Sequence, residues 1–280
     1  MARIKGKYII GAVGTVTYKQ TKHGGVISSR VRTVQQTDAT KKSAAFFGNM
    51  SVFNKNLRVY LSAVGHQDTG LMTRLNKEML GIISPCYDKE TKVYDFSKSY
   101  FGRLNGIDLN DSSPLKDYLY PLPSCHQHEN KLIVNIPEMV IHENLIFAAY
   151  ASICVMQLKV IHFDLNGGYL KDVDVTRLII NSSDTMVAAQ EFTFETFPGT
   201  LSVLAIGLQY YKKENGFQVA LNSVDFSPSA IIFAMFSKGI FSEKIKETSL
   251  IQTEEGMKST RITIWDKKHS GFPFQQLPVE

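Results

Sequence analysis

The sequence contains few cysteines, begins without a signal-like segment and has no long uninterrupted apolar run. Three cysteines in 280 residues are too few for the disulfide framework of small secreted domains, so they fit a reducing compartment. The N-terminus, Met-Ala-Arg-Ile-Lys-Gly-Lys, lacks the apolar stretch and cleavage site of a secretory signal. The longest apolar tract, residues 145–160, is interrupted by Ser152, Gln157 and Lys159, which argues against a membrane helix. We therefore expect synthesis in a bacterial or viral cytoplasm and no membrane span.

Sequence signatures of catalysis are also lacking. The chain has seven histidines but no Gly-x-Ser-x-Gly turn that would present a nucleophile beside them. Gly11 and Gly14 are not followed by the lysine and hydroxyl of a phosphate-binding loop. Asp172 and Asp174 alternate with valines, a pattern typical of the solvated face of a strand rather than of a glycosidase pair. We expect a non-enzymatic protein with no catalytic residue and no cofactor.

The densest group of metal-ligand residue types is Cys-His-Gln-His-Glu at residues 125–129. A structural zinc site normally has a second ligand pair at a recognisable spacing, whereas the nearest further candidates, His142 and Cys154, are separated in the sequence. The segment is therefore predicted to be a polar surface loop that binds no metal.

Positive charge is concentrated at the N-terminus. Residues 1–42 contain nine Lys or Arg and a single acid, Asp38, which gives +8 and leaves −3 for the rest of the chain. Such a basic arm can contact phosphate, an acidic protein surface or only solvent. Its cations alternate with β-forming apolar residues, which favours adding strands to a neighbouring subunit over a flexible polycation. The candidate residues for nucleic-acid or subunit contact are Arg3, Lys5, Lys7, Lys19, Lys22, Arg30 and Arg32.

A β-hairpin and a long helix are expected in the first part of the chain. Residues 15–21 and 25–32 read as hairpin strands joined by a turn at residues 22–25, whereas residues 9–14 look irregular. Thr37 can cap a helix over residues 37–64. Steps of three and four place one apolar stripe along it, formed by Phe46, Met50, Phe53, Leu57, Tyr60 and Val64.

A second helix is predicted for residues 71–83, capped by Asp68 or Thr69 and ended by Pro85. The two helices would form a helical hairpin with their apolar stripes facing. The alternative is that the stripe makes a helical contact between chains. Gly48, inside the first helix, suggests a close backbone contact.

The first 60 residues or so resemble a protein family. They read Arg-Ile-Lys-Gly, then I-I-G-A-V-G-T-V-T-Y, a Gly-Gly turn, Ser-Arg-Val-Arg, Thr37 and the Phe46-Phe47 pair. This order is similar to the start of a family of uncharacterised proteins from Bacteroidota and their phages, with a Gly-rich strand, an Arg-ending hairpin and a Thr-capped aromatic helix. The resemblance implies an N-terminal β and helix module followed by β-rich domains. It implies no catalytic activity and no site residues.

The remaining sequence predicts a β-sandwich. Residues 84–130 are aromatic and turn-rich and are expected to be an irregular connector. Asn215-Gly216 marks a hairpin between residues 204–210 and 217–221. Further runs rich in β-branched and aromatic residues predict strands at 132–136, 145–151, 153–165, 173–180, 191–197 and 229–236. Residues 240–280 are expected to form a last hairpin, 250–253 with 261–265, and an apolar tail that docks.

These expectations define an α+β chain that is mainly β. Its predicted parts are residues 1–83 (basic hairpin and helical hairpin), 84–130 (connector), 131–239 (antiparallel β-sandwich, with the jelly roll as one candidate form) and 240–280 (hairpin and tail). The favoured function is a structural or assembly protein, such as a phage or phage-like virion component, that contacts copies of itself or other structural subunits through the arm and helix. The alternatives are a nucleic-acid-binding protein that uses the basic arm and a carbohydrate-binding sandwich.

Overall fold

The computed structural model describes residues 3–29, 36–88, 90–91, 93–173 and 175–241, and the backbone of 261–264. Antiparallel sheets with two α-helices confirm the predicted class, α+β and mainly β. The chain divides into two compact units, Met1–Ala44 and Ala45–Glu280. The boundary expected at residue 83 therefore falls inside the second unit.

The first unit contains a four-stranded antiparallel sheet in the order β1-β2-β3-β4. Its strands are β1 (Arg3–Lys5), β2 (Tyr8–Val13), β3 (Val16–Thr21) and β4 (Gly24–Ser29). The predicted hairpin is β3–β4, in which Thr21 pairs with Gly24 across the turn. The prediction that residues 9–14 are irregular is wrong, because most of them belong to β2. Gly11 pairs with Tyr18 there and has a φ of +114°, which glycine adopts easily.

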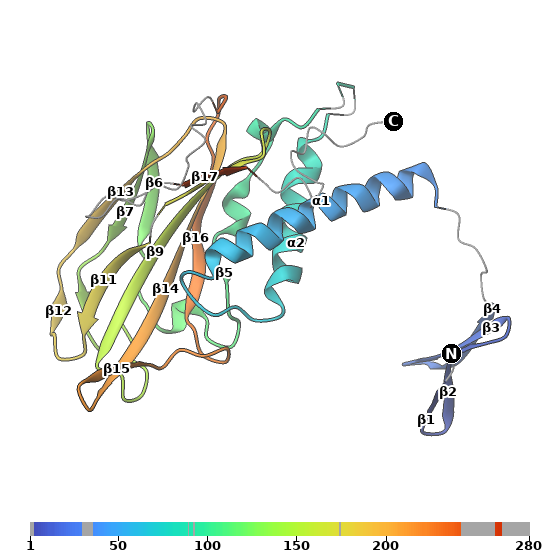
Figure 1. Cartoon of the computed structure of the whole chain (residues 1–280), viewed down its shortest axis with the longest axis horizontal. Helices are drawn as coiled ribbons and strands as arrows, with labels where there is room; N and C mark the ends of the chain where they lie inside the picture. Colours follow the sequence, from blue (N-terminus) through green and yellow to red (C-terminus); the bar gives the residue numbers. More distant parts are fainter. Residues whose placement is uncertain are drawn as a thin grey trace. The chain divides into compact units, whose positions relative to one another are not determined.

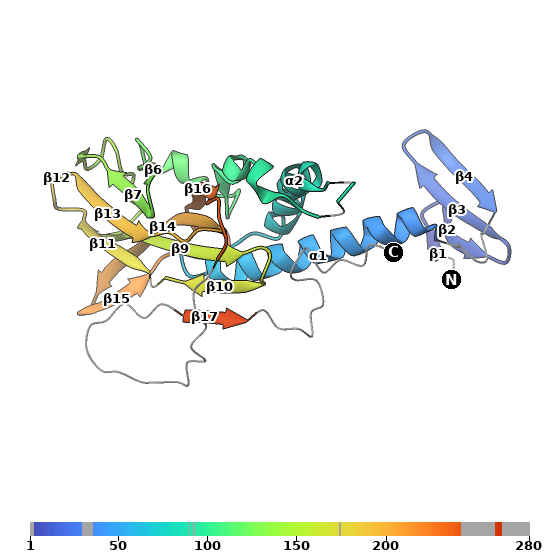
Figure 2. The ribbon, with the colours of Figure 1, turned by 90° about the horizontal axis from the view of Figure 1, so that it is seen from above.

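The two α-helices are α1 (Asp38–Leu61) and α2 (Leu71–Ile83). Thr37 acts at the start of α1 as predicted, since its Oγ1 accepts a hydrogen bond from the N–H of Thr40 at 3.2 Å. α1 ends at Leu61, so Val64 lies in the following turn. Figures 1 and 2 show that the helices cross rather than run side by side, and their apolar residues share a core with the large sheet.

The large sheet of the second unit has eight strands, with the path β17-β10-β9-β14-β16-β5, β11 also pairing with β9 and β15 with β14. The strands are β5 (Ile107–Asp108), β9 (Ile153–Asp164), β10 (Tyr169–Asp172), β11 (Thr176–Asn181), β14 (Thr200–Glu214), β15 (Phe217–Ala220), β16 (Ser229–Phe236) and β17 (Arg261–Ile264). The predicted turn at Asn215-Gly216 is present, with both residues at positive φ. β17 pairs with β10, whereas its expected partner, residues 250–253, lies outside the described residues, as do Trp265 and the tail.

A smaller sheet has the order β13-β7-β6, with β6 (Ser124–His128), β7 (Lys131–Ile136) and β13 (Gln190–Glu195). A two-stranded sheet pairs β8 (Met139–Val140), which follows β7 in the sequence, with β12 (Met186–Val187), which precedes β13. Short 3₁₀ helices complete the described elements at Ser84–Cys86, Phe96–Lys98, Phe101–Leu104 and Leu115–Asp117.

Both faces of the large sheet are covered. Ile161 and Phe163 of β9 pack in a core with the apolar residues of α1 and α2. Leu158 and Val160, which alternate with them, pack in a second core with β7 and β13. Figures 1 and 2 show the helices and the small sheet on opposite sides of the large sheet. The second unit is thus a sandwich of two sheets with an added helical layer, and the strand order does not confirm a jelly roll.

Two local expectations differ from the structure. Residues 145–151 form no strand; Leu145 makes single bridges to Leu119 and Ile141, and Tyr150 has a φ of +66°, which interrupts an extended chain. The expected connector, residues 84–130, packs into the body: Phe96 and Phe101 are buried with ring centroids 5.9 and 6.4 Å from that of Phe236. Its aromatic residues supply core, so the segment belongs to the second unit.

Candidate functional site

The register of the β1–β4 sheet separates its side chains by chemistry. Cross-strand partners point to the same face, so the pairs Ile4–Ile9, Gly11–Tyr18 and Tyr18–Ile27 define one face and Lys5–Tyr8 and Lys19–Val26 the other. The first, which we call the apolar face, carries Ile4, Ile9, Val13, Val16, Tyr18 and Ile27 and no charged residue. The second, the basic face, carries Arg3, Lys5 and Lys19 together with Tyr8, Ile10 and Val26.

The apolar face is not covered by any of the residues that the structure describes in its own unit. None of residues 3–29 is buried, and Ile4, Ile9 and Ile27 are 79%, 50% and 64% exposed. Covering such a face would remove apolar surface from water, at a gain of about 25 cal/mol for each Å² buried. Contiguous exposed apolar side chains of this kind mark contact surfaces.

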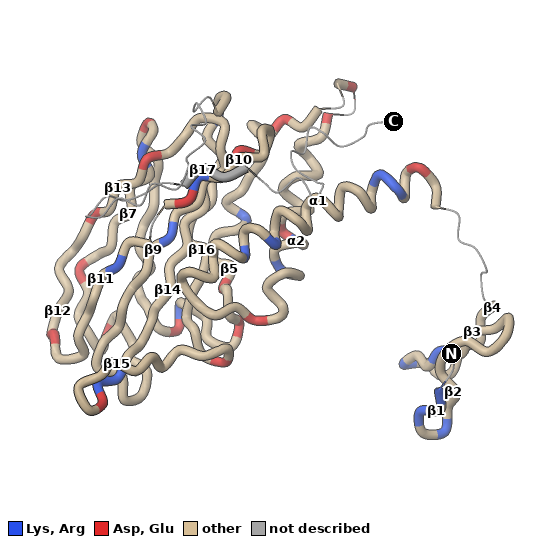
Figure 3. The backbone as a smooth tube through the Cα atoms, in the orientation of Figure 1, with Lys and Arg blue, Asp and Glu red and all other residues tan. Residues whose placement is uncertain are grey.

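The predicted contact residues fall partly on this sheet. Arg3, Lys5 and Lys19 lie on the basic face, and Lys7 and Lys22 lie in the turns β1–β2 and β3–β4. Arg30 and Arg32 lie outside the described residues. Figure 3 shows Lys and Arg but no Asp or Glu along β1–β4, and residues 3–29 include no acid. The structure thus brings three of the seven predicted cations onto one face.

The apolar stripe of α1 belongs to the core of a single chain. Met50, Phe53, Leu57 and Val64 are fully buried, whereas Phe46 and Tyr60 are partly buried. The ring of Phe53 meets that of Phe163 edge-on, with centroids 5.0 Å apart. The predicted oligomer contact therefore does not involve the centre of the stripe. Gly48, expected at a close contact, has no atom within 4 Å of where a Cβ would lie.

The first turns of α1 remain exposed. Every residue from Asp38 to Ala45 is exposed, and Phe47 is 49% exposed. These turns extend α1 beyond its packed part, so they lack the tertiary packing of one face that supplies most helical stability. The first turns of α1, which follow β4 in the sequence, are therefore a second exposed surface.

The Cys-His-Gln-His segment is strand β6 rather than a loop. Cys125 and Gln127 pair with the core residues Val134 and Leu132, so the two histidines point to the opposite, exposed face. Burial raises the pKa of the Cys125 thiol to about 12. Among the described residues, no group of three or more His, Cys, Asp or Glu is arranged to hold a metal ion. The alternation of the strand explains why these neighbours in sequence do not converge.

A buried His–Ser pair was not found from the sequence. Nδ1 of His162 on β9 lies 2.9 Å from Oγ of Ser202 on β14, and each residue is only 1% exposed. Burial, with a contribution from the Lys171 charge, lowers the pKa of His162 to about 3. The edge-on ring of Phe197, 5.1 Å away between centroids, covers the imidazole. A nucleophile needs access to substrate, so this neutral, enclosed pair is a core hydrogen bond rather than a catalytic dyad.

An arginine links α2 to the loop after β5. Arg74 forms ion pairs with Asp68 at 2.7 Å and with Asp111 at 2.6 Å, and donates to the carbonyl of Asp108 at 3.0 Å. Burial acts to raise the pKa of Asp68, but hydrogen bonds from Arg74 and the N–H of Asp111 outweigh it and lower that pKa to about 2. The sequence predicted Asp68 or Thr69 as the cap of α2; the N-cap position is occupied by Gly70, and Asp68 Oδ1 accepts a hydrogen bond from the N–H of Leu71 at 2.9 Å. The arrangement is a structural clamp, because the guanidinium neutralises both carboxylates.

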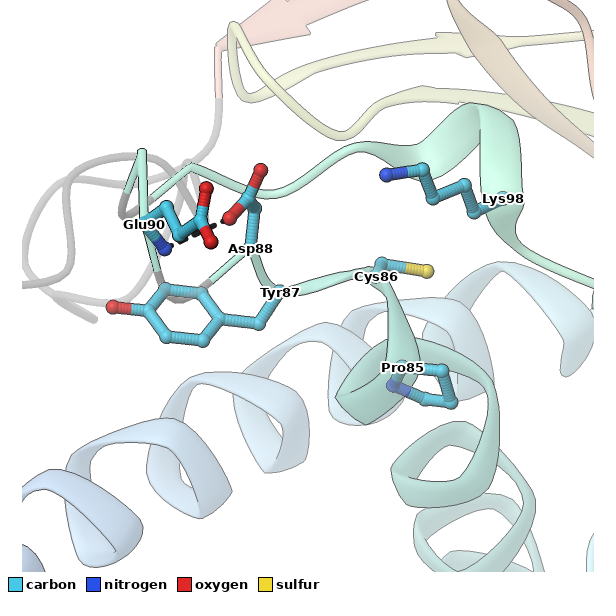
Figure 4. A pocket seen from close by; sticks show the side chains of 6 residues that line it. All are labelled: Pro85, Cys86, Tyr87, Asp88, Glu90 and Lys98. Atoms are coloured by element: carbon cyan, nitrogen blue, oxygen red, sulfur yellow. Dashed lines mark hydrogen bonds between the residues drawn. The ribbon is translucent and has the colours of Figure 1, made fainter.

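A hollow with a volume of about 480 Å³ lies beside the end of α2. Figure 4 shows Asp88 and Glu90 on one side of it and Lys98 on the other, with the N–H of Glu90 donating to Asp88 Oδ1 at 2.8 Å. Cys86 is 1% exposed, its Sγ donates to the carbonyl of Ile82, and burial raises the pKa of its thiol. A protonated, buried thiol is a poor nucleophile, so the hollow offers no evident chemistry.

Comparisons of the chain with protein-family models, with curated proteins and with solved structures find no match. The resemblance of the first 60 residues or so to a Bacteroidota and phage family stays a prediction. In the part of the chain that the structure describes, no helix is both long enough and apolar enough to cross a membrane. The strongest candidate for function is therefore the uncovered N-terminal sheet.

Proposed function

We propose that this protein is a non-enzymatic structural protein that assembles through its N-terminal unit, as a phage or phage-like virion component would. The observation that carries the proposal is the β1–β4 sheet, which has one apolar face and not one buried residue among residues 3–29. A sheet that buries none of its residues lacks the hydrophobic stabilisation of a packed core, which a partner surface on the apolar face would supply. The exposed first turns of α1 support the same conclusion.

The second unit fits the role of a self-sufficient body. Its large sheet is covered on both sides, and its two cores hold the fully buried rings and aliphatic side chains of the chain. A body with a complete core does not need the N-terminal unit to fold. Assembly and folding are therefore assigned to different parts of the chain.

Removing residues 1–32 tests the proposal. The full-length protein should form an oligomer, and the truncated protein should lose that oligomer while keeping the far-ultraviolet circular dichroism of a folded β protein. Light scattering coupled to size-exclusion chromatography measures the mass of both proteins at matched concentrations. A full-length protein that is monomeric at all concentrations, or a truncated protein that assembles like the full chain, would overturn the proposal.

Nucleic-acid binding is the second candidate, and the basic face favours it. Arg3, Lys5 and Lys19 share that face, Lys7 and Lys22 lie in adjoining turns, and residues 3–29 contain no acid to offset them. If all five cations met phosphates, the logarithm of the affinity for duplex DNA would fall with the logarithm of salt with a slope of about −4 to −5. Fluorescence anisotropy between low and near-physiological salt measures that slope, and a slope near zero excludes this candidate.

A further inference from the structure

The two faces of the β1–β4 sheet differ in what can cover them. The apolar face bears Ile4, Ile9, Val13, Val16, Tyr18 and Ile27, and its remaining positions are Gly11, Gln20, Gly25 and Ser29. A nucleic acid or an acidic protein would be drawn to the opposite face, where Arg3, Lys5 and Lys19 lie. The apolar face therefore needs an apolar, uncharged occupant.

We propose that this occupant is the same face of a second copy of the chain, so that two N-terminal sheets pack face to face. The inference rests on the proposed function and specifies the surface and the partner. A two-fold symmetric contact uses the same surface patch on both copies, so the patch must be complementary to itself. The apolar face meets that requirement because it has no charge to repel its copy. Contact through the basic faces would instead oppose Arg3, Lys5 and Lys19 with their equivalents.

The pattern of side chains on the face suits sheet-on-sheet packing. Stacked sheets lie about 10 Å apart, with side chains of the two inner faces interdigitating. Three cross-strand rows contain large apolar residues, one of which runs from Gly11 through Tyr18 to Ile27. Gly11 has no side chain, so its place in the row leaves room beside Tyr18 for a side chain from the opposing sheet. The basic faces of both copies would then point outward to solvent.

The size of the face predicts how tight the contact is. Strand β1 has three residues and β2, β3 and β4 have six each; at about 3.3 Å per residue and about 4.8 Å between strands they give a face of about 330 Å² per copy. Stable specific interfaces bury about 800 Å² on each partner. The contact should therefore be weak and concentration-dependent by itself, and it would act as one of several contacts in a larger assembly.

Two adjacent residues of β4 provide a matched test in the full-length chain. Ile27 lies on the apolar face and is 64% exposed, whereas Val26 lies on the basic face and is 46% exposed. Ile27→Lys should weaken self-association at least about tenfold, because an unpaired ammonium would have to enter the interface. Val26→Lys adds the same charge to the same strand and should leave the association within about threefold of wild type, as expected for a solvated surface change. Sedimentation equilibrium over a concentration series measures both constants.

Cross-linking keeps the test independent of any loss of folding in the lysine variant. Ile27→Cys and Val26→Cys are each treated with a short bis-maleimide, with wild type as the control for Cys86, Cys125 and Cys154. The proposal expects cross-linked dimers from Ile27→Cys well above those from Val26→Cys and wild type. Equal yields from the two variants would overturn it.

The outcomes separate this inference from the proposed function. If wild type assembles but Ile27→Lys and Val26→Lys both assemble normally, the face-to-face contact is wrong and assembly uses another surface. If wild type is monomeric throughout, the proposed function fails as well. If nuclease treatment dissociates the wild-type assembly, a nucleic acid bridges the copies and the direct contact is refuted.

Discussion

Replacing Phe53 with Ala tests whether α1 is a core element that the body requires. Phe53 is fully buried between α1 and the large sheet, and its ring lies edge-on to Phe163 of β9 with centroids 5.0 Å apart. Truncating a buried Phe to Ala removes transfer free energy and leaves a cavity, at a cost of about 3–5 kcal/mol. The lost ring pair adds about 0.5–1.5 kcal/mol beyond the area term, which places the expected loss near the top of that range, at about 4–5 kcal/mol.

Urea unfolding monitored by far-ultraviolet circular dichroism measures this loss of unfolding free energy. Since whole domains have unfolding free energies of about 5–15 kcal/mol, the variant should be severely destabilised at 37 °C. Phe47→Ala is the matched control: it makes the same change six residues earlier in α1, at a side chain that is 49% exposed, and it should cost less than about 1 kcal/mol. A loss below about 1 kcal/mol for Phe53→Ala, with an unchanged denaturant slope, would show that the side chain is not packed and would refute the reasoning.

Two further predictions concern the interior. A Cβ at Gly207 would lie 1.9 Å from the carbonyl oxygen of Val64. Gly207→Ala should therefore destabilise the second unit by about 1–3 kcal/mol or more in urea unfolding. A Cβ at Gly48 would meet nothing within 4 Å, so Gly48→Ala should stabilise α1 by up to about 1 kcal/mol. Equal effects of the two changes would contradict the close approach. The pKa of His162 is lowered to about 3, against about 6.5 in an unfolded chain, so the unfolded state binds the extra proton and stability falls as pH decreases from about 6.5 towards 3. His162→Gln should flatten that fall between pH 7 and 4.5, and identical pH profiles for the two proteins would contradict burial of a neutral imidazole.

Local signals in the sequence predicted much of the β-structure. The strand expected at residues 229–236 is β16, Ser229–Phe236, because a short apolar run that follows Pro228 has the length typical of a buried strand. The β14–β15 hairpin was equally readable, since Asn215-Gly216 supplies two residues that tolerate positive φ. Such features depend on residues close together in the chain.

Features that depend on distant residues were missed or misassigned. Asn49 of α1 is only 7% exposed, and Asn54, further along the same helix, is fully buried and donates a hydrogen bond to Asn76 of α2 at 2.8 Å. A polar residue is recognisable as interior only when its hydrogen-bond partner is known. His162 is similar, because Ser202 lies 40 residues further along the chain.

The sequence by itself determined the class of the fold, most strands, both helices and the concentration of positive charge at the N-terminus. Only the tertiary structure decided that the apolar stripe of α1 packs on the large sheet, that residues 84–130 fill the core and that Cys125 and His126 face opposite ways. It also decided the division of the N-terminal sheet into an apolar and a basic face, since that division follows from the pairing register of four strands. The physical reason is that periodicity and turn chemistry act over a few residues, whereas register and burial are set by which segments meet in space.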